Sequence, residues 1–433
     1  MRVEIISRKL VSPSSPTPPH LRSLKISALD QLPAPIYPGV IFYYLANENT
    51  TERDKRLERS VSEALSIFYP LAGRYHKKHL LVDCQDQGVE YLEAHVSEKL
   101  SQVLHGNIQV EQLNHLVPFL VESDTSPLLA FQINKFECGG LAIGLRISHR
   151  IADGFTMTSF MSTWATTCRV GTHRVSSPGF CLSSLFPAKH IPGMTEDSSI
   201  MKSEIKVVTK NYTFDRKVIS NLKAISTTAA SLSGLLVHHQ PTRLNVVTAF
   251  IWETLMKVGK SRRGYLRPSV LSHAVNMRGK TTLPIPEEAC GNFFRQAIAR
   301  FLPNDSTELH HLVNLVTDAI RNAISDCNTA TNCDDLLSTV YKSVAEMYEE
   351  TNNPEVDLYM FNSLCRMPVN DVDFGWGKPA WVSNVHKPFP IINLMDTRDD
   401  GIEAWLTLEE QDMILFEQEL KVVQPFQSKS VAS

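Results

Sequence analysis

The alternation of apolar and polar positions predicts a sharp junction between a strand and a helix in the first half of the chain. Residues 141–148 alternate apolar with small or polar side chains, which is the period of a β-strand. The next apolar side chains recur at the spacing of one helix face, and they are Met157, Phe160, Met161 and Trp164. We therefore expect a buried strand to end near residue 148 and a helix to begin near residue 154.

The same patterns predict most of the other elements. Helical spacing covers residues 55–68 and stops before a proline, and it returns after Thr242, whose hydroxyl suits an N-cap. Residues 309–344 are mostly helical with a break near residues 328–332, whereas residues 79–84 and the stretch through Tyr91 resemble strands. Strands and helices mix without regular βαβ alternation. This pattern indicates an α/β protein with mixed α+β layers rather than a doubly wound sheet.

The length of 433 residues exceeds one typical core and indicates two domains of roughly 200 residues each. Periodicity disappears over residues 170–201, where glycine, serine and proline accumulate, so the domain boundary is predicted there. We expect an N-terminal domain at residues 1–175, a crossover loop at 176–205 and a C-terminal domain at 206–433. A segment near residues 360–390 is expected to cross back to the first domain.

Composition excludes several classes of partner. The formal net charge of −3 gives no support for nucleic-acid binding, and no apolar run approaches the roughly 18 residues that span a membrane. The N-terminus lacks the pattern of a signal peptide. The eight cysteines form no C-x-x-C pair, which fits reduced thiols better than a disulfide framework. We therefore expect a cytoplasmic protein, and a monomer.

The predicted strand–helix junction carries an H-x-x-x-D pattern, with His149 and Asp153 four residues apart. A histidine at such a junction can project into a cleft and act as a general base, although a packed structural histidine is the ordinary alternative. The pattern alone is weak, because 15 histidines give roughly one chance match. A second copy, His79 to Asp83, lies in a strand-like run with no helix after it, and we interpret it as a strand end.

A second motif occurs about 220 residues further on, and its residues are Asp373, Phe374, Gly375, Trp376 and Gly377. Together with the H-x-x-x-D-G motif, this D-F-G-W-G sequence resembles the plant BAHD acyltransferases, which transfer acyl groups from acyl-CoA to alcohols or amines. Further stretches agree in the order of the family, and they are residues 68–74, 276–278, 291–294, 394–396 and 401–404. The resemblance covers nearly the whole chain and is greatest to the branch that acetylates benzyl-type alcohols and alkaloids.

The resemblance implies a fold and a reaction. It implies two similar α/β domains related to chloramphenicol acetyltransferase, each a mixed sheet with helices, and a channel between them with the catalytic histidine at its centre. His149 would take the proton from the acceptor hydroxyl and then protonate the departing CoA thiolate, so no acyl-enzyme is needed.

Asp153 leaves three interpretations open: orientation of the imidazole in a triad, an N-cap, or a salt bridge. The resemblance implies the structural role, with Arg278 as the partner in the salt bridge. Gly154 would allow a tight entry into the helix.

The remaining candidates have weaker support. The D-F-G-W-G motif is expected to form a packed structural turn, because the Gly-rich loop and H-R-D motif of a kinase do not precede it. Where the family often has Thr-Ser-Trp, this chain has Asn362-Ser363-Leu364, so the amide of Asn362 is a candidate oxyanion donor and the aromatic wall is lost. A basic run at the end of the helix after Thr242 is by default a solvated helix end, but the resemblance places it near the CoA 3′-phosphate. Its residues are Lys257, Lys260, Arg262 and Arg263.

No metal site is expected, because the pairs His238-His239 and His310-His311 lack further ligands at suitable spacing. The implied function is acyl-CoA-dependent O-acylation of a hydroxyl on a plant specialised metabolite. Acetyl-CoA is the expected co-substrate, a small-molecule alcohol the expected acceptor, and no cofactor is bound permanently. The alternatives are an acylsugar or longer-chain acyltransferase of the same family, or a catalytically silent relative that binds a metabolite. A serine hydrolase is disfavoured because the chain lacks a G-x-S-x-G elbow.

Overall fold

The computed structural model describes residues 1–433 except 47–49, 106–108, 122, 190–205, 233–239 and 424–433. Contacts divide the chain into two compact units. The first unit comprises Met1–Thr195, Ile285–Phe293 and Met367–Val385, and the second comprises Glu196–Pro284, Phe294–Arg366 and His386–Ser433. Each unit contains a six-stranded mixed sheet with helices, which confirms the predicted fold class. The boundaries expected at residues 175 and 206 stay predictions, since residues 190–205 lie outside the described part of the chain.

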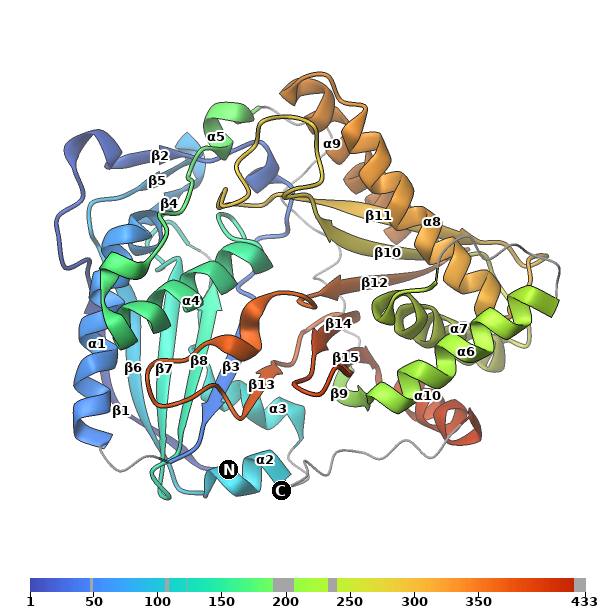
Figure 1. Cartoon of the computed structure of the whole chain (residues 1–433), viewed down its shortest axis with the longest axis horizontal. Helices are drawn as coiled ribbons and strands as arrows, with labels where there is room; N and C mark the ends of the chain where they lie inside the picture. Colours follow the sequence, from blue (N-terminus) through green and yellow to red (C-terminus); the bar gives the residue numbers. More distant parts are fainter. Residues whose placement is uncertain (47–49, 106–108, 122, 190–205, 233–239, 424–433) are drawn as a thin grey trace. The chain divides into compact units, whose positions relative to one another are not determined.

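The main sheet of the first unit has the strand order β1-β6-β7-β8-β3-β13, with β6 and β7 parallel and the other neighbours antiparallel. Its strands are β1 (Val3–Val11), β3 (Gly39–Tyr44), β6 (Val89–Val96), β7 (Leu129–Phe136), β8 (Leu141–Ile147) and β13 (Trp381–Asn384). A small second sheet joins β2 (Ser23–Lys25), β5 (Leu81–Asp83) and β4 (Arg74–His76). Figure 1 shows β13, from late in the sequence, beside β3.

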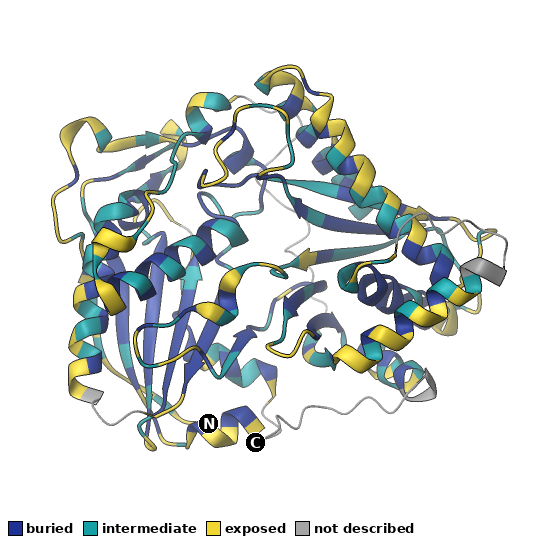
Figure 2. Cartoon of the chain, viewed as in Figure 1, coloured by how far each residue is buried: buried dark blue, intermediate teal, exposed yellow. Residues whose placement is uncertain are grey.

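Two long helices of the first unit pack together, α1 (Thr50–Ile67) and α4 (Gly154–Val170). The apolar face predicted for α4 is confirmed, because its four predicted side chains are all buried. The ring of Trp164 lies against Phe131 of β7, with ring centroids 4.6 Å apart, and its indole N–H donates to the hydroxyl of Ser60 on α1 at 3.0 Å. The centre of this sheet is accordingly dark blue in Figure 2. The shorter helices of this unit are α2 (Leu100–His105), α3 (Val110–Leu113) and α5 (Leu182–Leu185).

The second unit has the strand order β11-β10-β12-β14-β15-β9. Its strands are β9 (Val207–Phe214), β10 (Ser269–Asn276), β11 (Phe294–Phe301), β12 (Asp357–Ser363), β14 (Ile391–Asp396) and β15 (Ile402–Glu409). Its helices are α6 (Arg216–Leu232), α7 (Arg243–Arg263), α8 (Leu309–Asn328), α9 (Cys333–Thr351) and α10 (Glu410–Val423). One apolar core joins α7 and α8 to β10, β12, β14 and β15.

Most of the predicted elements are confirmed. The hydroxyl of Thr242 caps α7 by accepting from the backbone N–H of Asn245, and α8 ends where the break was predicted. The strand expected at residue 79 begins only at Leu81, because residues 77–79 form a short 3₁₀ turn. Leu80 at the end of this turn has a positive φ of 49°, which interrupts the extended backbone. Within the described part of the chain, no helix combines the length and apolar character of a membrane span.

Candidate active site

His149 lies in the turn between β8 and α4, where the sequence placed it. The backbone N–H of His149 donates to the carbonyl of Ile36 at 2.9 Å, and the preceding Ser148 N–H donates to Leu128 O at 2.7 Å. These two bonds fix the turn to neighbouring segments of the first unit. The residue is half-buried, while its Nδ1 atom has almost no exposed surface. The backbone of the turn is therefore fixed, and Nδ1 of the imidazole faces inwards.

The surroundings of His149 keep its imidazole neutral at neutral pH. Burial lowers the pKa of His149 below its ordinary value of 6.5, since a charged ring is poorly solvated there. The negative charge of Asp153 and a hydrogen bond with the Asn292 side chain act in the opposite direction and limit this lowering of the pKa. A neutral imidazole near pH 7 is the form that can accept a proton.

Asp153 is the N-cap of α4. Its Oδ1 accepts from the backbone N–H of Thr156 at 2.9 Å and from the hydroxyl of Thr156 at 3.0 Å. Its Oδ2 accepts from the backbone N–H of Phe293 at 3.2 Å. The side chain is buried, so these bonds are formed away from water. Of the three interpretations of Asp153, the N-cap is present, and the same carboxylate fastens residues 291–293 to the start of α4.

The segment 291–293 brings a polar network to His149 that the sequence did not reveal. The N–H of Gly291 donates to Thr156 Oγ1 at 2.9 Å, and the Asn292 Nδ2 donates to the carbonyl of His149 at 2.8 Å. The same Nδ2 donates to Oδ1 of the buried Asp30 at 2.9 Å. In the sequence Asn292 stands out only as part of a family motif, and Asp30 carries no signal of its own. Asp30 and Asn292 are 262 positions apart in the chain, so no local sequence pattern could have linked them.

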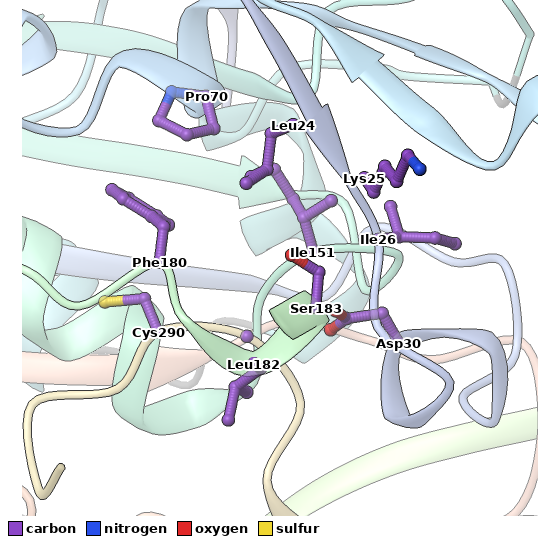
Figure 3. A pocket seen from close by; sticks show the side chains of 11 residues that line it. Leu24, Lys25, Ile26, Asp30, Pro70, Ile151, Phe180, Leu182, Ser183 and Cys290 are labelled. Atoms are coloured by element: carbon purple, nitrogen blue, oxygen red, sulfur yellow. The ribbon is translucent and has the colours of Figure 1, made fainter. Parts of the chain in front are cut away.

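A small hollow borders Asp30, lined by apolar side chains that include Ile26, Ile151 and Leu182. Figure 3 shows these side chains together with Asp30 and Cys290 around the hollow. Its volume of about 20 Å³ is enough for one water molecule. A CoA thioester or an alcohol such as a benzyl derivative does not fit, so this hollow is not the substrate site.

The D-F-G-W-G motif forms a packed turn against α1 and α4. Asp373 Oδ1 accepts from the N–H groups of Gly375 at 2.8 Å and Gly377 at 2.9 Å, and both glycines have positive φ. The buried ring of Phe374 stacks on Trp376 with centroids 5.5 Å apart. Arg169 of α4 forms an ion pair with Asp373 at 3.5 Å. The hydrogen bonds of the turn, rather than a ligand, account for the carboxylate and the glycines.

Arg278 and Asn362 belong to the second unit. Arg278 follows β10, is buried, and donates from Nη1 to Asn276 Oδ1 at 3.0 Å. Asn362 lies on β12 with an exposed side chain, next to the buried Phe361. The pairing of Arg278 with Asp153 and the oxyanion role of Asn362 stay predictions.

The basic residues at the end of α7 are largely engaged by carboxylates of the second unit. Lys257 binds Glu253 at 2.7 Å, Arg262 binds Asp412 at 2.7 Å, and Arg263 binds Asp357. Lys260 is exposed on the same helix.

Local carboxylates thus balance three of these four charges, which weakens the case for a phosphate site formed by all four together.

No metal site was expected at the two pairs of adjacent histidines. His238 and His239 lie outside the described residues. His310 is buried at the start of α8, where its Nδ1 lies 3.2 Å from a carboxylate oxygen of Glu308. Over the ranges of the chain that the structure describes, no group of three or more His, Cys, Asp or Glu side chains is arranged to hold a metal ion.

Comparison with known proteins gives the class. The family model described as "Transferase family" matches residues 1–423. Acetyl-CoA-benzylalcohol acetyltransferase of Clarkia breweri is 36% identical over 96% of this chain and 98% of its own length. Vinorine synthase of Rauvolfia serpentina is 34% identical, covering 97% of each chain.

Solved structures agree with this assignment. The crystal structure of vinorine synthase matches 99% of this chain and 100% of its own with a TM-score of 0.83 and 31% identity. The F. sporotrichioides TRI101 structure, complexed with coenzyme A and T-2, matches 92% of this chain and 98% of its own with a TM-score of 0.69. At 16% identity the TRI101 match supports the fold alone.

The fold and the full-length relatives define this protein as an acyl-CoA-dependent acyltransferase. The chain belongs to the BAHD family of plant specialised metabolism, as the two motifs had predicted.

Proposed function

We propose that this protein transfers an acetyl group from acetyl-CoA to a hydroxyl of a plant specialised metabolite, with His149 as the general base. The observation that carries the proposal is the position of His149, half-buried at the β8–α4 junction with its pKa lowered by burial. An imidazole in this state can accept a proton at neutral pH without first losing one.

The reaction proceeds in two proton transfers at His149. Its imidazole takes the proton of the acceptor hydroxyl while the acceptor oxygen attacks the thioester carbonyl. The tetrahedral intermediate collapses by breaking the carbon–sulfur bond, and the imidazolium returns the proton to the CoA thiolate. The amide of Asn362 donates to the oxyanion, a contribution of roughly 3–4 kcal/mol for one well-placed donor. No acyl-enzyme forms.

The other residues hold this arrangement. Asp153 caps α4 and pairs with Arg278, and Gly154 admits the chain into the helix. The turn from Asp373 to Gly377 supports the CoA side of the channel through its packing on α1 and α4. Among the four basic residues of α7, the exposed Lys260 is the best candidate to contact the CoA 3′-phosphate.

Acetyl-CoA is proposed as the donor because the Clarkia breweri relative is named as an acetyl-CoA-dependent acetyltransferase of benzyl alcohol. The acceptor is a small alcohol, of benzyl, alkaloid or sugar type. The enzyme is proposed to act as a monomer in the cytoplasm, whose reducing conditions suit eight cysteines that form no disulfide.

The test is release of free CoA thiol from acetyl-CoA by the purified protein across a panel of alcohols, with the His149→Ala variant alongside. Acceptor-dependent release that is lost in the variant supports the proposal. Release only from longer acyl-CoAs, or only with sugar acceptors, replaces the donor or acceptor assignment. Binding of acetyl-CoA with no release from any donor indicates a silent relative.

A further inference from the structure

Arg146 lies near the end of β8, three residues before His149, on the face of the sheet that is turned away from α4. Phe131 of β7 packs against Trp164 of α4, and Leu145 of β8 is directly opposite Phe131 in the register of the two strands. Successive side chains of a strand point to opposite faces, so Leu145 points toward α4 and Arg146 points away from it.

The neighbouring strand β3 leaves room for the side chain of Arg146. Gly39 of β3 is its partner in the register, and a Cβ atom at Gly39 would lie only 3.3 Å from Cγ of Arg146. The arginine side chain passes this glycine, and its Nη1 donates to the carbonyl oxygen of Tyr37 at 2.9 Å. The preceding carbonyl, that of Ile36, accepts the backbone N–H of His149 at 2.9 Å. The guanidinium therefore binds the same short segment that holds the backbone of His149.

No carboxylate balances the charge of Arg146 within the part of the chain that the structure describes. The bond to Tyr37 is the one hydrogen bond of this guanidinium there, and it forms no ion pair with a described residue. Glu90 belongs to the same row of the sheet, but it lies two strands away beyond Ala130 and is paired with Arg8. Arg146 is half-buried, and burial lowers its pKa with no opposing effect from a nearby carboxylate.

This arrangement is unfavourable for the protein alone. A partly buried charge without a counterion loses hydration and gains no ion pair in return. An arginine also cannot escape this cost by losing its proton. The hydrogen bond to the Tyr37 carbonyl needs only a neutral donor, so it does not account for the charge. Local arrangements that cost stability without an evident structural return are characteristic of functional sites.

We propose that Arg146 binds a carboxylate of the acceptor, so that the preferred acceptor is an alcohol that also carries a carboxylate group. A guanidinium binds a carboxylate through two parallel N–H···O bonds. Tyr37 engages Nη1 alone, which leaves the edge formed by Nε and Nη2 for such a pair. The inference rests on the proposed function, with His149 as the general base and acetyl-CoA as the donor.

The acceptor is the substrate that can supply this carboxylate. The acetyl group carries no charge, and the phosphates of CoA are separated from its thioester by the whole pantetheine arm. A group that binds beside the segment holding His149 therefore belongs to the molecule whose hydroxyl reacts there. A charged acyl group, such as malonyl, is the other possible source of a carboxylate, and the experiment distinguishes it.

Acceptor selectivity tests the proposal. We would measure CoA thiol release from acetyl-CoA with the meta and para isomers of hydroxymethylbenzoate and with their methyl esters, which keep the hydroxyl but lose the charge. The wild type should favour at least one acid over its ester in kcat/KM by about tenfold or more, as expected for hydrogen bonds between charged groups. Arg146→Gln should lose this preference mainly through a higher KM for the acid. Arg146→Lys, which keeps the charge but not the planar fork, should retain part of it.

Arg8→Gln is the matched control, because it removes a guanidinium of the same sheet that is already paired with Glu90. It should keep the wild-type preference for the acid. Equal loss of the preference in Arg8→Gln and Arg146→Gln contradicts a site at Arg146, and so does a wild type that never favours an acid over its ester. Transfer from malonyl-CoA to the methyl esters that is lost in Arg146→Gln would move the carboxylate to the acyl group and overturn the acceptor assignment.

Binding is measured separately in the His149→Ala variant, without turnover. An acid should raise the melting temperature of this variant more than its ester does, and adding Arg146→Gln should abolish the difference. Equal shifts for acid and ester refute the inference, whether or not the wild type transfers acetyl groups. An acid-specific shift together with a wild type that releases no CoA supports the inference and counts against the proposed function alone.

Stability without ligand distinguishes a binding role from a structural one. Arg146→Gln deprives no carboxylate of its partner among the described residues, so its midpoint of urea unfolding should equal or exceed that of the wild type. A clearly lower midpoint would assign Arg146 to the support of the Tyr37 segment and overturn the proposal.

Discussion

Replacing Asp153 by alanine tests whether this carboxylate acts in folding or in catalysis. The substitution removes the N-cap of α4, which costs about 1 kcal/mol. It also removes the acceptor of the buried Phe293 N–H, which costs about 1–3 kcal/mol. We therefore expect the free energy of unfolding to fall by roughly 2–4 kcal/mol, with turnover falling as residues 291–293 lose their anchor at the start of α4.

The assay is urea unfolding followed by fluorescence, with the enzyme's turnover measured on the folded fraction at the same temperature. Asp153→Asn is the matched variant, because its Oδ1 can still cap Thr156 while its NH₂ cannot accept from Phe293. It should lose only the second contribution and keep measurable activity. A triad carboxylate behaves differently, since its replacement by asparagine lowers kcat by about 10⁴-fold with the geometry intact. An Asp153→Ala protein that unfolds like the wild type but has no turnover would refute our reasoning.

Three other predictions concern pH and backbone strain. Because burial lowers the pKa of His149 below 6.5 and the neutral ring is the active form, the acid limb of kcat/KM should be centred below pH 6.5. An acid limb centred above pH 6.5 in a pH–rate profile contradicts this. Burial lowers the pKa of His273 from 6.5 to about 4, so the unfolded chain binds a proton in this window that the folded chain does not, and stability should fall by roughly 3 kcal/mol between pH 6.5 and 4. His273→Phe, whose ring can stack on Phe361 as the imidazole does, should lose this share of the pH dependence in urea titrations; an unchanged slope would assign it elsewhere. Gly375→Ala and Gly377→Ala both strain a backbone at φ near +105°, at a cost of about 1–3 kcal/mol each. Only the new methyl group at residue 375 also lies close to another side chain, 3.1 Å from the guanidinium of Arg56, so Gly375→Ala should have the lower melting temperature of the two variants. Equal melting temperatures would show that this contact relaxes without cost.

Local patterns were enough for the elements and for the position of His149. The period of two in β8 and the helical spacing of α4 place the histidine between them, because both patterns report burial of one face. The cap of Thr242 on α7 was also predictable from local sequence, since its partner Asn245 lies only three residues away.

The network around His149 could not be predicted from local patterns. Asp30, Asn292 and His149 come from three distant segments, and only the folded backbone brings them within hydrogen-bonding distance. The ion pairs of Lys257, Arg262 and Arg263 were missed similarly, because two of the three carboxylates are far away along the chain. The positive charges at the end of α7, taken without these carboxylates, had suggested a site for an anion.

The discontinuous first unit has a consequence for the order of events during synthesis. Its edge strand β13 pairs with β3, whose six residues are all buried, yet β13 is made more than 330 residues later. At a synthesis rate of 5–20 residues per second, β3 waits for roughly 17–70 s before its partner leaves the ribosome. During that time β3 is an unpaired apolar edge, the kind of strand that recruits other chains. Expression of this enzyme should therefore depend on chaperones that hold the nascent chain, and a product truncated before residue 381 should aggregate even though the residues around His149 are present.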